Sequence, residues 1–213
     1  MMTQMRRNGL ILAAFALVST ILVMTTQWLT EDRIAEQQRS ELMTTLNSLI
    51  PPALHDNDLY ADCTLVTADE LGLSEPQPVY RSRREGQPTA LALRTTAPDG
   101  YSGNIHLLVA LNDSGTLLGV RALSHRETPG LGDKIEVRRS DWIHSFQGQQ
   151  VRGADDPRWD VQRNGGMFDA FAGATITPRA VVNAVQRTVL YATEHQQQLF
   201  NANANCSQSG DMQ

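Results

Sequence analysis

The sequence of 213 residues lacks most of the patterns that mark a catalytic or metal centre. It has only two cysteines, no Cys-x-x-Cys pair and no His/Cys cluster at zinc spacing, which argues against iron-sulfur, c-type haem and structural zinc sites. It has no Gly-x-Gly-x-x-Gly or Walker motif for a dinucleotide or ATP. No Ser-His-Asp or Cys-His arrangement can be argued, and the histidines show no paired spacing. We therefore predict no catalytic residue and no metal ligand.

Positive charge is also scarce. The chain has 18 basic and 23 acidic residues, a net charge of −5, and no run of lysine or arginine. A protein that binds the phosphate backbone of a nucleic acid needs a basic patch, so nucleic acid is not expected as a partner. The neighbouring carboxylates of Asp155 and Asp156 have no further ligands beside them, and we interpret them as solvated side chains.

One long stretch, residues 9–29, contains no charged residue at all. A helix needs about 20 mainly apolar residues to cross a bilayer, so this stretch is predicted to span a membrane. Arg6 and Arg7 precede it and no small-x-small cleavage site follows, which favours an uncleaved signal anchor over a cleaved signal peptide, the alternative. The positive-inside rule then predicts a cytoplasmic stub at residues 1–8 and export of everything after the span.

A second helical pattern follows the span, over residues 30–50. Thr30, followed by two acidic residues, has the character of a helix start, and Pro51-Pro52 ends the pattern. The candidate inward-facing residues are Ile34, Leu42, Leu46 and Leu49. We predict a helix that connects the span to the exported domain.

Strand patterns occupy the middle of the chain. Four segments, 79–82, 90–95, 105–111 and 117–123, are separated by turn signals such as Glu85-Gly86 and the stretch 112–115. This spacing predicts an antiparallel meander. Residues 51–204 are therefore expected to form an α+β domain with an antiparallel sheet and flanking helices, followed by a flexible tail at residues 205–213.

The two cysteines, Cys63 and Cys206, both lie in the part of the chain that we expect to be exported. In an oxidising compartment they could pair and tie the tail to the domain. Two unpaired thiols remain the alternative, because pairing requires a proximity that the sequence does not reveal.

The most informative stretch is residues 169–187. Small residues lead into Thr175, and Thr177-Pro178 has the pattern of a helix cap followed by proline at the first helical position. The start of a helix has unpaired N–H groups and a partial positive charge, which suits a phosphate held near the hydroxyls of Thr175 and Thr177. The simpler alternative is a helix start that only caps itself.

Gly173-Ala174-Thr175, with Asp169 upstream and Thr177 downstream, resembles the flavinylation motif of the FMN-binding domain family. This family is shared by the C subunits of sodium-pumping NADH:quinone reductases and the G subunits of Rnf complexes. In the family the threonine after Gly-Ala is joined to the phosphate of FMN as a phosphoester. The resemblance therefore implies a covalent FMN on Thr175.

Two further strings resemble the same family. The string from Glu127 to Gly132, Glu-Thr-Pro-Gly-Leu-Gly, matches a second hallmark at every position, and the stretch from Gly100 to Ile105 matches a Gly-Tyr-x-Gly-x-Ile pattern. In relatives the second hallmark lines the flavin pocket. The residues that the resemblance assigns to the surroundings of FMN are Glu127, Thr128, Gly130, Leu131, Gly132, Gly173, Ala174 and Thr177.

The length of the chain favours the Rnf-type G subunits, called Rsx in some bacteria, over the longer C subunits. The resemblance implies an electron-relay subunit of an inner-membrane complex that couples electron transfer between a ferredoxin-like donor and NAD to ion movement. Its main domain would lie in the periplasm. The implied partners are the other membrane subunits, the lipid around residues 9–29, and a flavin transferase during maturation. No independent turnover is expected from this chain.

One position departs from the family pattern, because Ala172 stands where relatives usually have serine or threonine. This departure leaves open a flavin-free, membrane-tethered binding or assembly subunit of the same kind of complex. The C subunit of a sodium-pumping NADH:quinone reductase is a further alternative. A flavin domain in a signalling protein is disfavoured, since no additional spans or cysteine-rich segments are present.

Overall fold

The structure is a computed structural model that describes residues 2–206, and it divides into two units, Met1–Thr44 and Thr45–Gln213. Its helices are α1 (Met2–Leu49), α2 (Ile176–Glu194) and α3 (Gln196–Asn201). Its strands are β1 (Cys63–Ala68), β2 (Leu73–Arg84), β3 (Gln87–Gly100), β4 (Gly103–Asn112) and β5 (Leu117–Ser124). Short 3-10 helices are η1 (Pro52–Leu54), η2 (Asp69–Leu71), η3 (Asp133–Ile135), η4 (Trp142–Phe146) and η5 (Gln162–Asn164).

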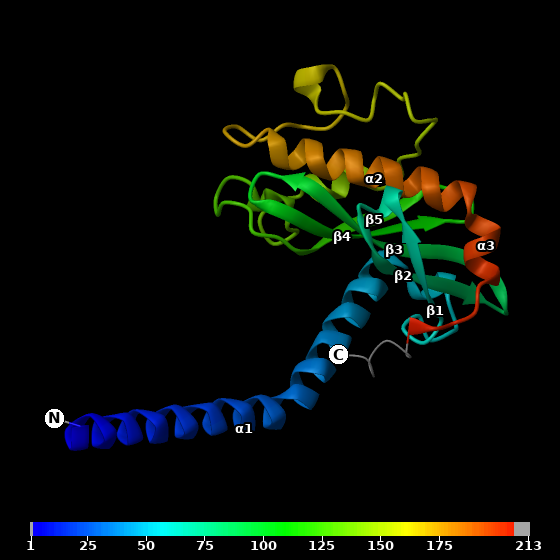
Figure 1. Cartoon of the computed structure of the whole chain (residues 1–213). Helices are drawn as coiled ribbons and strands as arrows, with labels where there is room; N and C mark the ends of the chain where they lie inside the picture. Colours follow the sequence, from blue (N-terminus) through cyan, green and yellow to red (C-terminus); the bar gives the residue numbers. More distant parts are fainter. Residues whose placement is uncertain (1, 207–213) are drawn as a thin grey trace. The chain divides into compact units, whose positions relative to one another are not determined.

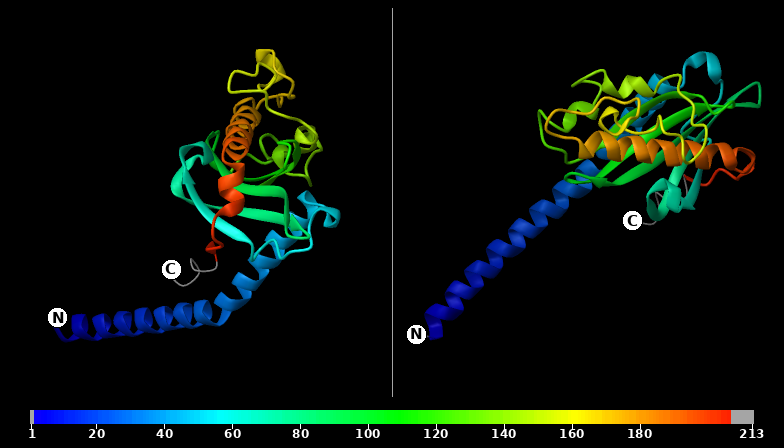
Figure 2. Two further views of the ribbon diagram at one scale, coloured as in Figure 1. Left: turned by 90° about the vertical axis from the view of Figure 1, so that its right-hand side faces the viewer. Right: turned by 90° about the horizontal axis from the view of Figure 1, so that it is seen from above.

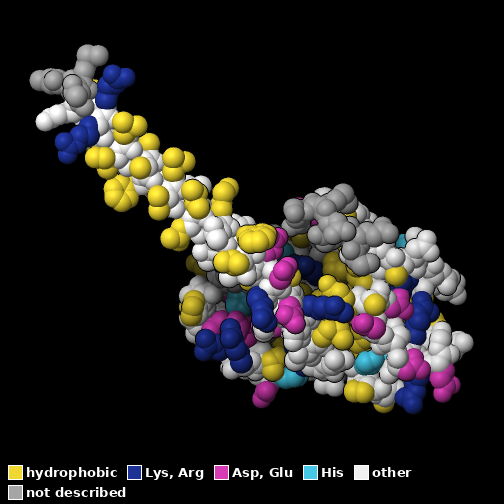
Figure 3. Space-filling view, turned by 90° about the horizontal axis from the view of Figure 1, so that it is seen from below, with side chains coloured by type: hydrophobic (Ala, Val, Ile, Leu, Met, Phe, Trp, Pro, Cys, Tyr) yellow, Lys and Arg dark blue, Asp and Glu magenta, His cyan; other side chains and the backbone are white. Residues whose placement is uncertain are grey.

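The first unit consists of α1 residues, and its side chains are exposed along the apolar run. Phe15 and Leu22, for example, are 70% and 64% exposed. Figure 3 shows hydrophobic side chains gathered along this helix. α1 is the one described helix that is long and apolar enough to cross a membrane. Such a surface is stable in lipid and unfavourable in water.

The expected helix start at Thr30 is wrong, because α1 continues through Thr30 without a break, so the predicted span and connecting helix are parts of one helix. The Thr30 hydroxyl donates to the carbonyl of Thr26 at 2.8 Å, which is a bond within the helix and not a cap. Ile34, expected to face inward, is 54% exposed. The expected inward positions Leu46 and Leu49 are buried in the second unit.

The second unit is built on one antiparallel sheet with the strand order β1-β2-β3-β4-β5. The predicted α+β class and the four-stranded meander are confirmed, with strands longer than predicted. The β2–β3 turn shows why Glu85-Gly86 signals a hairpin, since both residues adopt a positive φ, 52° and 74°. β1 adds a fifth strand that the sequence did not predict, with an irregular register between Val66 and Ala68.

α2 lies along one face of this sheet (Figure 1) and forms the main core with it. Val181, Val185 and Val189 recur on one face of the helix and are buried with Leu107 and Val109 of β4. Figure 2 shows the segment between η4 and α2, drawn in yellow, beside the N-terminal half of α2. The helix start is thereby fixed at one end of the sheet, next to the loops that follow β3 and β5.

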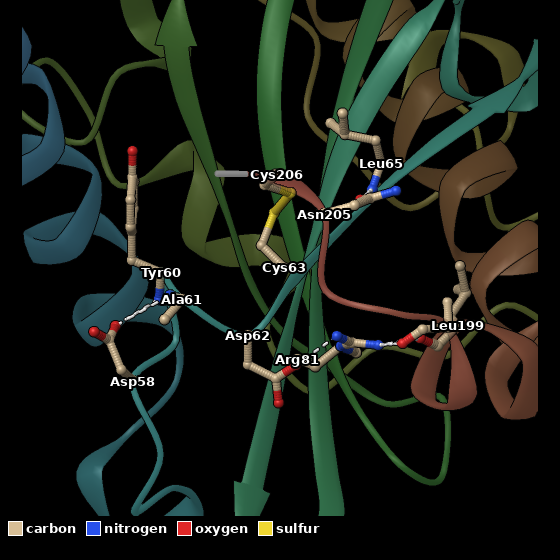
Figure 4. Close-up of a disulfide and its surroundings, with 11 residues drawn as sticks. Asp58, Tyr60, Ala61, Asp62, Cys63, Leu65, Arg81, Leu199, Asn205 and Cys206 are labelled. Carbon is tan, nitrogen blue, oxygen red and sulfur yellow. Dashed lines mark hydrogen bonds and ion pairs between the residues drawn. A yellow bond between two sulfur atoms is a disulfide. The ribbon is translucent and has the colours of Figure 1, made fainter. Parts of the chain in front are cut away.

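The C-terminal part of the chain is fastened to the sheet edge (Figure 4). A disulfide joins Cys63 of β1 to Cys206, with a Cα–Cα distance of 5.5 Å. The backbone N–H of Asn205 donates to the carbonyl of Cys63 at 3.0 Å, and the side-chain oxygen of Asn205 accepts from the N–H of Leu65 at 2.7 Å. Asn205 and Cys206 are thus part of the folded domain, two residues beyond the expected boundary; residues 207–213 of the predicted tail lie outside the described residues.

A buried arginine supports the same attachment. The side chain of Arg81 on β2 forms an ion pair with Asp62 at 2.6 Å and donates to the carbonyls of Leu199 at 3.3 Å and of Ala202. Helix C-termini leave carbonyl groups unpaired, and a buried guanidinium with its five N–H groups is well suited to satisfy them. Arg81 therefore holds the end of α3 against the sheet.

Candidate functional site

A cleft with a cavity volume of about 280 Å³ opens where three distant segments meet. These are the loop between β3 and β4, the turn after β5, and the stretch that leads into α2. The residues that line the cleft are Tyr101, Glu127, Thr128, Leu131, Gly132, Gly173, Ala174, Thr175, Ile176 and Thr177. Every predicted site residue except Gly130 is among them. The depression that Asp69 and Arg187 line contains none of the predicted residues.

Thr175 lies at the start of α2, at the N-cap position, and its side chain makes no capping hydrogen bond. Within the helix geometry, the N–H groups of Thr175, Ile176 and Thr177 have no acceptor in the preceding turn. Pro178, the third helical residue, has no N–H. The Thr175 hydroxyl therefore lies beside free donors and the positive end of the helix dipole, an environment that favours an anion.

The predicted capping role of Thr177 is wrong. The helix begins at Ile176, two residues earlier than predicted, so Thr177 is already helical, and its fully buried hydroxyl donates to the carboxylate of Glu127. The other carboxylate oxygen of Glu127 accepts a hydrogen bond from the backbone N–H of Ser102 at 3.0 Å. Glu127, which is 5% exposed, thus connects all three segments of the cleft.

Glycine is required at the point where the turn approaches this carboxylate. A Cβ on Gly132 would lie 2.9 Å from the Cβ and a carboxylate oxygen of Glu127, and 3.0 Å from the Thr177 hydroxyl. Gly130 has a different role, since its φ is 79° and its N–H donates to Asp133 at 2.8 Å outside the cleft. It shapes the turn without lining the cavity.

Apolar side chains form the mouth of the cleft. Tyr101, Leu131 and Ile176 are 67%, 42% and 49% exposed, although each lines the cavity. Tyr101 and Ile176 were missing from the predicted site, even though the Gly-Tyr-x-Gly pattern had marked the loop of Tyr101. Exposed apolar surface beside a helix N-terminus suits a ligand with a flat, partly apolar ring and an anionic end.

Trp142 does not line the cleft. Its ring packs edge-on against Phe146 and Phe171 at centroid distances of 5.4 and 5.1 Å, and its indole N–H donates to the carbonyl of Asp169 at 2.9 Å. These contacts make Trp142 part of the core, and they fix the segment that precedes Gly173. Aromatic pairs of this geometry favour edge-to-face packing.

The interpretation of Asp156 as a solvated side chain is wrong, since its side chain is only 3% exposed. Asp156 forms an ion pair with Arg158 at 2.6 Å, and the hydrogen bond from Arg158 lowers the pKa of Asp156. The described residues contain no group of three or more His, Cys, Asp or Glu that could hold a metal ion.

A second, polar cleft of about 530 Å³ was not predicted. Its lining residues are Ser102, Gly103, Asn104, His106, Ser124, His125 and Arg126. Burial, followed by the positive charge of Arg94, lowers the pKa of His106. His125 stands two residues before Glu127, where the Glu-Thr-Pro-Gly-Leu-Gly string begins, and this nearness is the sequence signal that could have drawn attention to it.

Comparison with known proteins agrees with this geometry. The family model described as an FMN-binding domain matches residues 100–189, which include all three segments of the first cleft. The model described as the RnfG N-terminal region matches residues 1–49, which correspond to α1.

Full-length relatives are also found. The chain is 53% identical over 206 residues to the G subunit of the ion-translocating oxidoreductase complex of a Vibrio cholerae serotype O1 strain, which covers 97% of this chain and 99% of the relative. It is 51% identical over 208 residues to the protein of the same name from Shewanella oneidensis, with 97% and 98% covered. The corresponding Vibrio parahaemolyticus protein is 47% identical over all 213 residues, the whole of both chains.

Identity at this level over nearly the whole length confirms the resemblance predicted from the motifs and decides between the two branches of the family. The chain therefore belongs to the family of G subunits of ion-translocating oxidoreductase complexes, and it carries the FMN-binding domain of that family.

Proposed function

We propose that this protein is an electron-relay subunit of such a complex and that it carries FMN as a phosphoester on Thr175. The observation that carries the proposal is the position of the Thr175 hydroxyl, which lies in the cleft at the start of α2 without a capping partner. A hydroxyl that served only as a cap would be hydrogen-bonded to the backbone of the first turn. Bound FMN would supply one-electron and two-electron transfer.

The residues of the cleft fit this cofactor. The free N–H groups of Ile176 and Thr177 lie where they can stabilise the charge of the phosphoester. The side chains of Tyr101 and Leu131 offer apolar surface for a ring, and Gly132 lets the backbone approach closely. In the proposed roles Thr175 is the attachment point, the start of α2 holds the phosphate, and Glu127 with the turn after it surrounds the ring.

The attachment requires a co-reactant. The Thr175 oxygen would form its bond to the phosphorus of an activated flavin nucleotide, the hydroxyl proton would pass to a base, and the nucleotide leaving group would depart with the electron pair of the broken P–O bond. A flavin transferase is the class of enzyme that supplies both the donor and the base. The chain's own part is to present an accessible hydroxyl, which its half-buried position at the helix start allows.

We further propose that α1 spans the inner membrane through residues 9–29, with residues 1–8 in the cytoplasm and the domain from residue 51 onward in the periplasm. Arg6 and Arg7 before the apolar run support this orientation. The disulfide between Cys63 and Cys206 supports it independently, because such bonds persist in oxidising compartments such as the periplasm. In the complex, electrons would arrive from and leave to redox centres of the other membrane subunits.

The test compares the wild-type protein with Thr175→Ala and Thr128→Ala, all produced with export intact. Thr128 is a matched control, because it is an exposed threonine in the same cleft. After acid denaturation, wild type and Thr128→Ala are expected to keep flavin fluorescence and the added mass of one FMN less one water. Thr175→Ala should keep neither. Covalent flavin on Thr175→Ala would refute the assignment.

The flavin-free alternative predicts a different result. Ala172, which is exposed and stands where relatives usually have a hydroxyl, is the observation that favours it. If the wild-type polypeptide is colourless after denaturation while it still assembles with its partners, the assembly role is correct. Flavin that remains attached to wild type excludes that role.

A further inference from the structure

His125, directly after β5, uses both of its ring nitrogens. Nε2 lies 2.9 Å from a carboxylate oxygen of Glu136, and Nδ1 lies 3.1 Å from the backbone nitrogen of Glu127. The side chain is 8% exposed. His125 therefore has two fixed partners on opposite sides of the ring.

These partners determine the position of the proton. A backbone N–H can only donate, so Nδ1 must be the unprotonated acceptor and Nε2 must carry the proton that is donated to Glu136. The second oxygen of Glu136 accepts from Arg138, and this hydrogen bond is the main reason that the pKa of Glu136 is lowered. Glu136 therefore stays a carboxylate and holds the imidazole in this tautomer.

The bond to Nδ1 fixes a residue of the first cleft. Glu127 joins the β3–β4 loop through Ser102 and the start of α2 through Thr177, so its backbone must be held for its carboxylate to reach both. The bond from its N–H to His125 spans two residues, in the way that an Asx-turn does. It is the hydrogen bond that orients Glu127 from the side of β5.

A second proton on His125 would break this bond, because Nδ1–H and the N–H of Glu127 would then both be donors. The charged and titratable groups around the ring act in opposite directions. Glu136 favours the protonated imidazole, whereas Arg126, which lines the same polar cleft, and Arg138 behind Glu136 oppose added positive charge. His106 also lines this cleft, and its lowered pKa favours its neutral form. The tautomer is therefore held by one carboxylate within a basic surrounding.

We propose that His125 is a positioning residue for the flavin cleft: its Nδ1 atom orients Glu127, and protonation of that atom releases Glu127 and the turn that follows. The inference rests on the proposed function, because the turn that protonation would release is the one proposed to surround the flavin. The periplasm follows the external pH, so the cleft would respond to acidification outside the cell.

The test uses the full-length protein in detergent micelles and three variants. His125→Asn keeps an acceptor that can bond the N–H two residues on, but it cannot gain a proton. His125→Ala removes the acceptor. His144→Asn is the matched control, a half-buried histidine on η4 that lines neither cleft. The first measurement is hydrogen exchange of the Glu127 amide at neutral and mildly acidic pH, corrected for the intrinsic exchange rate.

In wild type and His144→Asn, acidification to about pH 5 should raise the corrected exchange rate about fivefold or more, the scale of one lost hydrogen bond. In His125→Asn the Glu127 amide should exchange slowly at both pH values, and in His125→Ala it should exchange fast at both. A wild-type rate that does not change with pH, or a slow rate in His125→Ala, would overturn the proposal. So would nitrogen NMR that places the neutral proton on Nδ1.

The second measurement separates this inference from the proposed function. The absorbance spectrum of the covalent flavin should shift on acidification in wild type and stay constant in His125→Asn, if the ring lies against this turn. The exchange experiment is repeated on Thr175→Ala, which should lack flavin. If wild type carries covalent flavin and Thr175→Ala does not, but the exchange rate of the Glu127 amide does not change with pH, only the role of His125 is refuted. A pH response of exchange in a flavin-free wild type would refute only the proposed function.

Discussion

The buried hydroxyl of Thr177 has a different partner from the one that the local sequence predicted. The Thr-x-Thr-Pro pattern predicted a helix cap, because the local sequence shows only the backbone that follows. In the structure the hydroxyl instead donates to Glu127, 50 residues earlier in the sequence. A hydrogen bond across that distance has no local signal, so only the folded chain reveals it.

The hydrogen bond from Thr177 to Glu127 predicts a different effect of mutation from that of a helix cap. Thr177→Val removes the donor but keeps the branched shape, so the buried carboxylate of Glu127 loses a partner. We expect the free energy of unfolding to fall by about 1–3 kcal/mol, the cost of an unsatisfied buried group. Thr177→Ser keeps the donor and loses one methyl group, at a cost of about 1 kcal/mol.

Urea denaturation of the two variants, followed by tryptophan fluorescence, measures the difference. Equal losses for valine and serine would show that the hydroxyl does not matter and would contradict the hydrogen-bonded role. Gly132 lies beside the hydrogen bond between Thr177 and Glu127, since any side chain at this position would displace one of these two residues.

At the scale of secondary structure, the elements with a strong period were predictable. β2 to β5 contain buried runs bounded by glycine or asparagine turns, and α2 shows valines at helical spacing. The sequence did not predict β1, whose pairing with β2 shifts register between Val66 and Ala68. A helix start was wrongly predicted at Thr30, since a threonine followed by acids has the same local pattern inside a helix as at its start.

The packing of α2 on the sheet can be tested at one position. Val185 is fully buried in the main core, so Val185→Ala removes two methyl groups and leaves a cavity between α2 and the sheet. We expect a loss of about 2 kcal/mol in the free energy of unfolding, by comparison with other large-to-small core changes. Glu194→Ala, at an exposed position of the same helix, should change it by less than about 0.5 kcal/mol.

Thermal or urea unfolding of both variants provides the measurement. Because the start of α2 also forms the cleft, the flavin spectrum of Val185→Ala should remain that of wild type while the protein is folded. An unchanged stability would mean that the helix does not depend on this contact with the sheet.

At the scale of the whole chain, the sequence predicted the span, the exported α+β domain and the motifs, but not their convergence. The loop of Tyr101, the turn of Glu127 and the stretch of Thr175 lie far apart in sequence and meet only because α2 crosses the sheet beside the ends of β3 and β5. The resemblance to a family predicted that these three segments belong to one site, which composition and periodicity could not predict. The polar cleft and the His125 contacts had no comparable motif.

The disulfide between Cys63 and Cys206 acts on the entire domain, because it closes a loop with a sequence separation of 143 residues. A long loop loses much conformational entropy in the unfolded state when it is closed. The chain-entropy estimate is about 5 kcal/mol, and measured effects are usually about 2–4 kcal/mol. Cys206→Ser should therefore lower the free energy of unfolding by about 2–4 kcal/mol. Arg81 should keep α3 in place in this variant, since its bonds to Asp62 and Leu199 do not involve the disulfide.

The double variant Cys63→Ser/Cys206→Ser is the matched control, because removing the second cysteine cannot remove the same bond again. Its stability should equal that of Cys206→Ser within about 0.5 kcal/mol. Urea denaturation of wild type with and without a reductant completes the measurement. The reduced wild-type protein should unfold at the same urea concentration as the variants. A wild-type transition that the reductant leaves unchanged would contradict a stabilising bond between the sheet edge and the C-terminal segment.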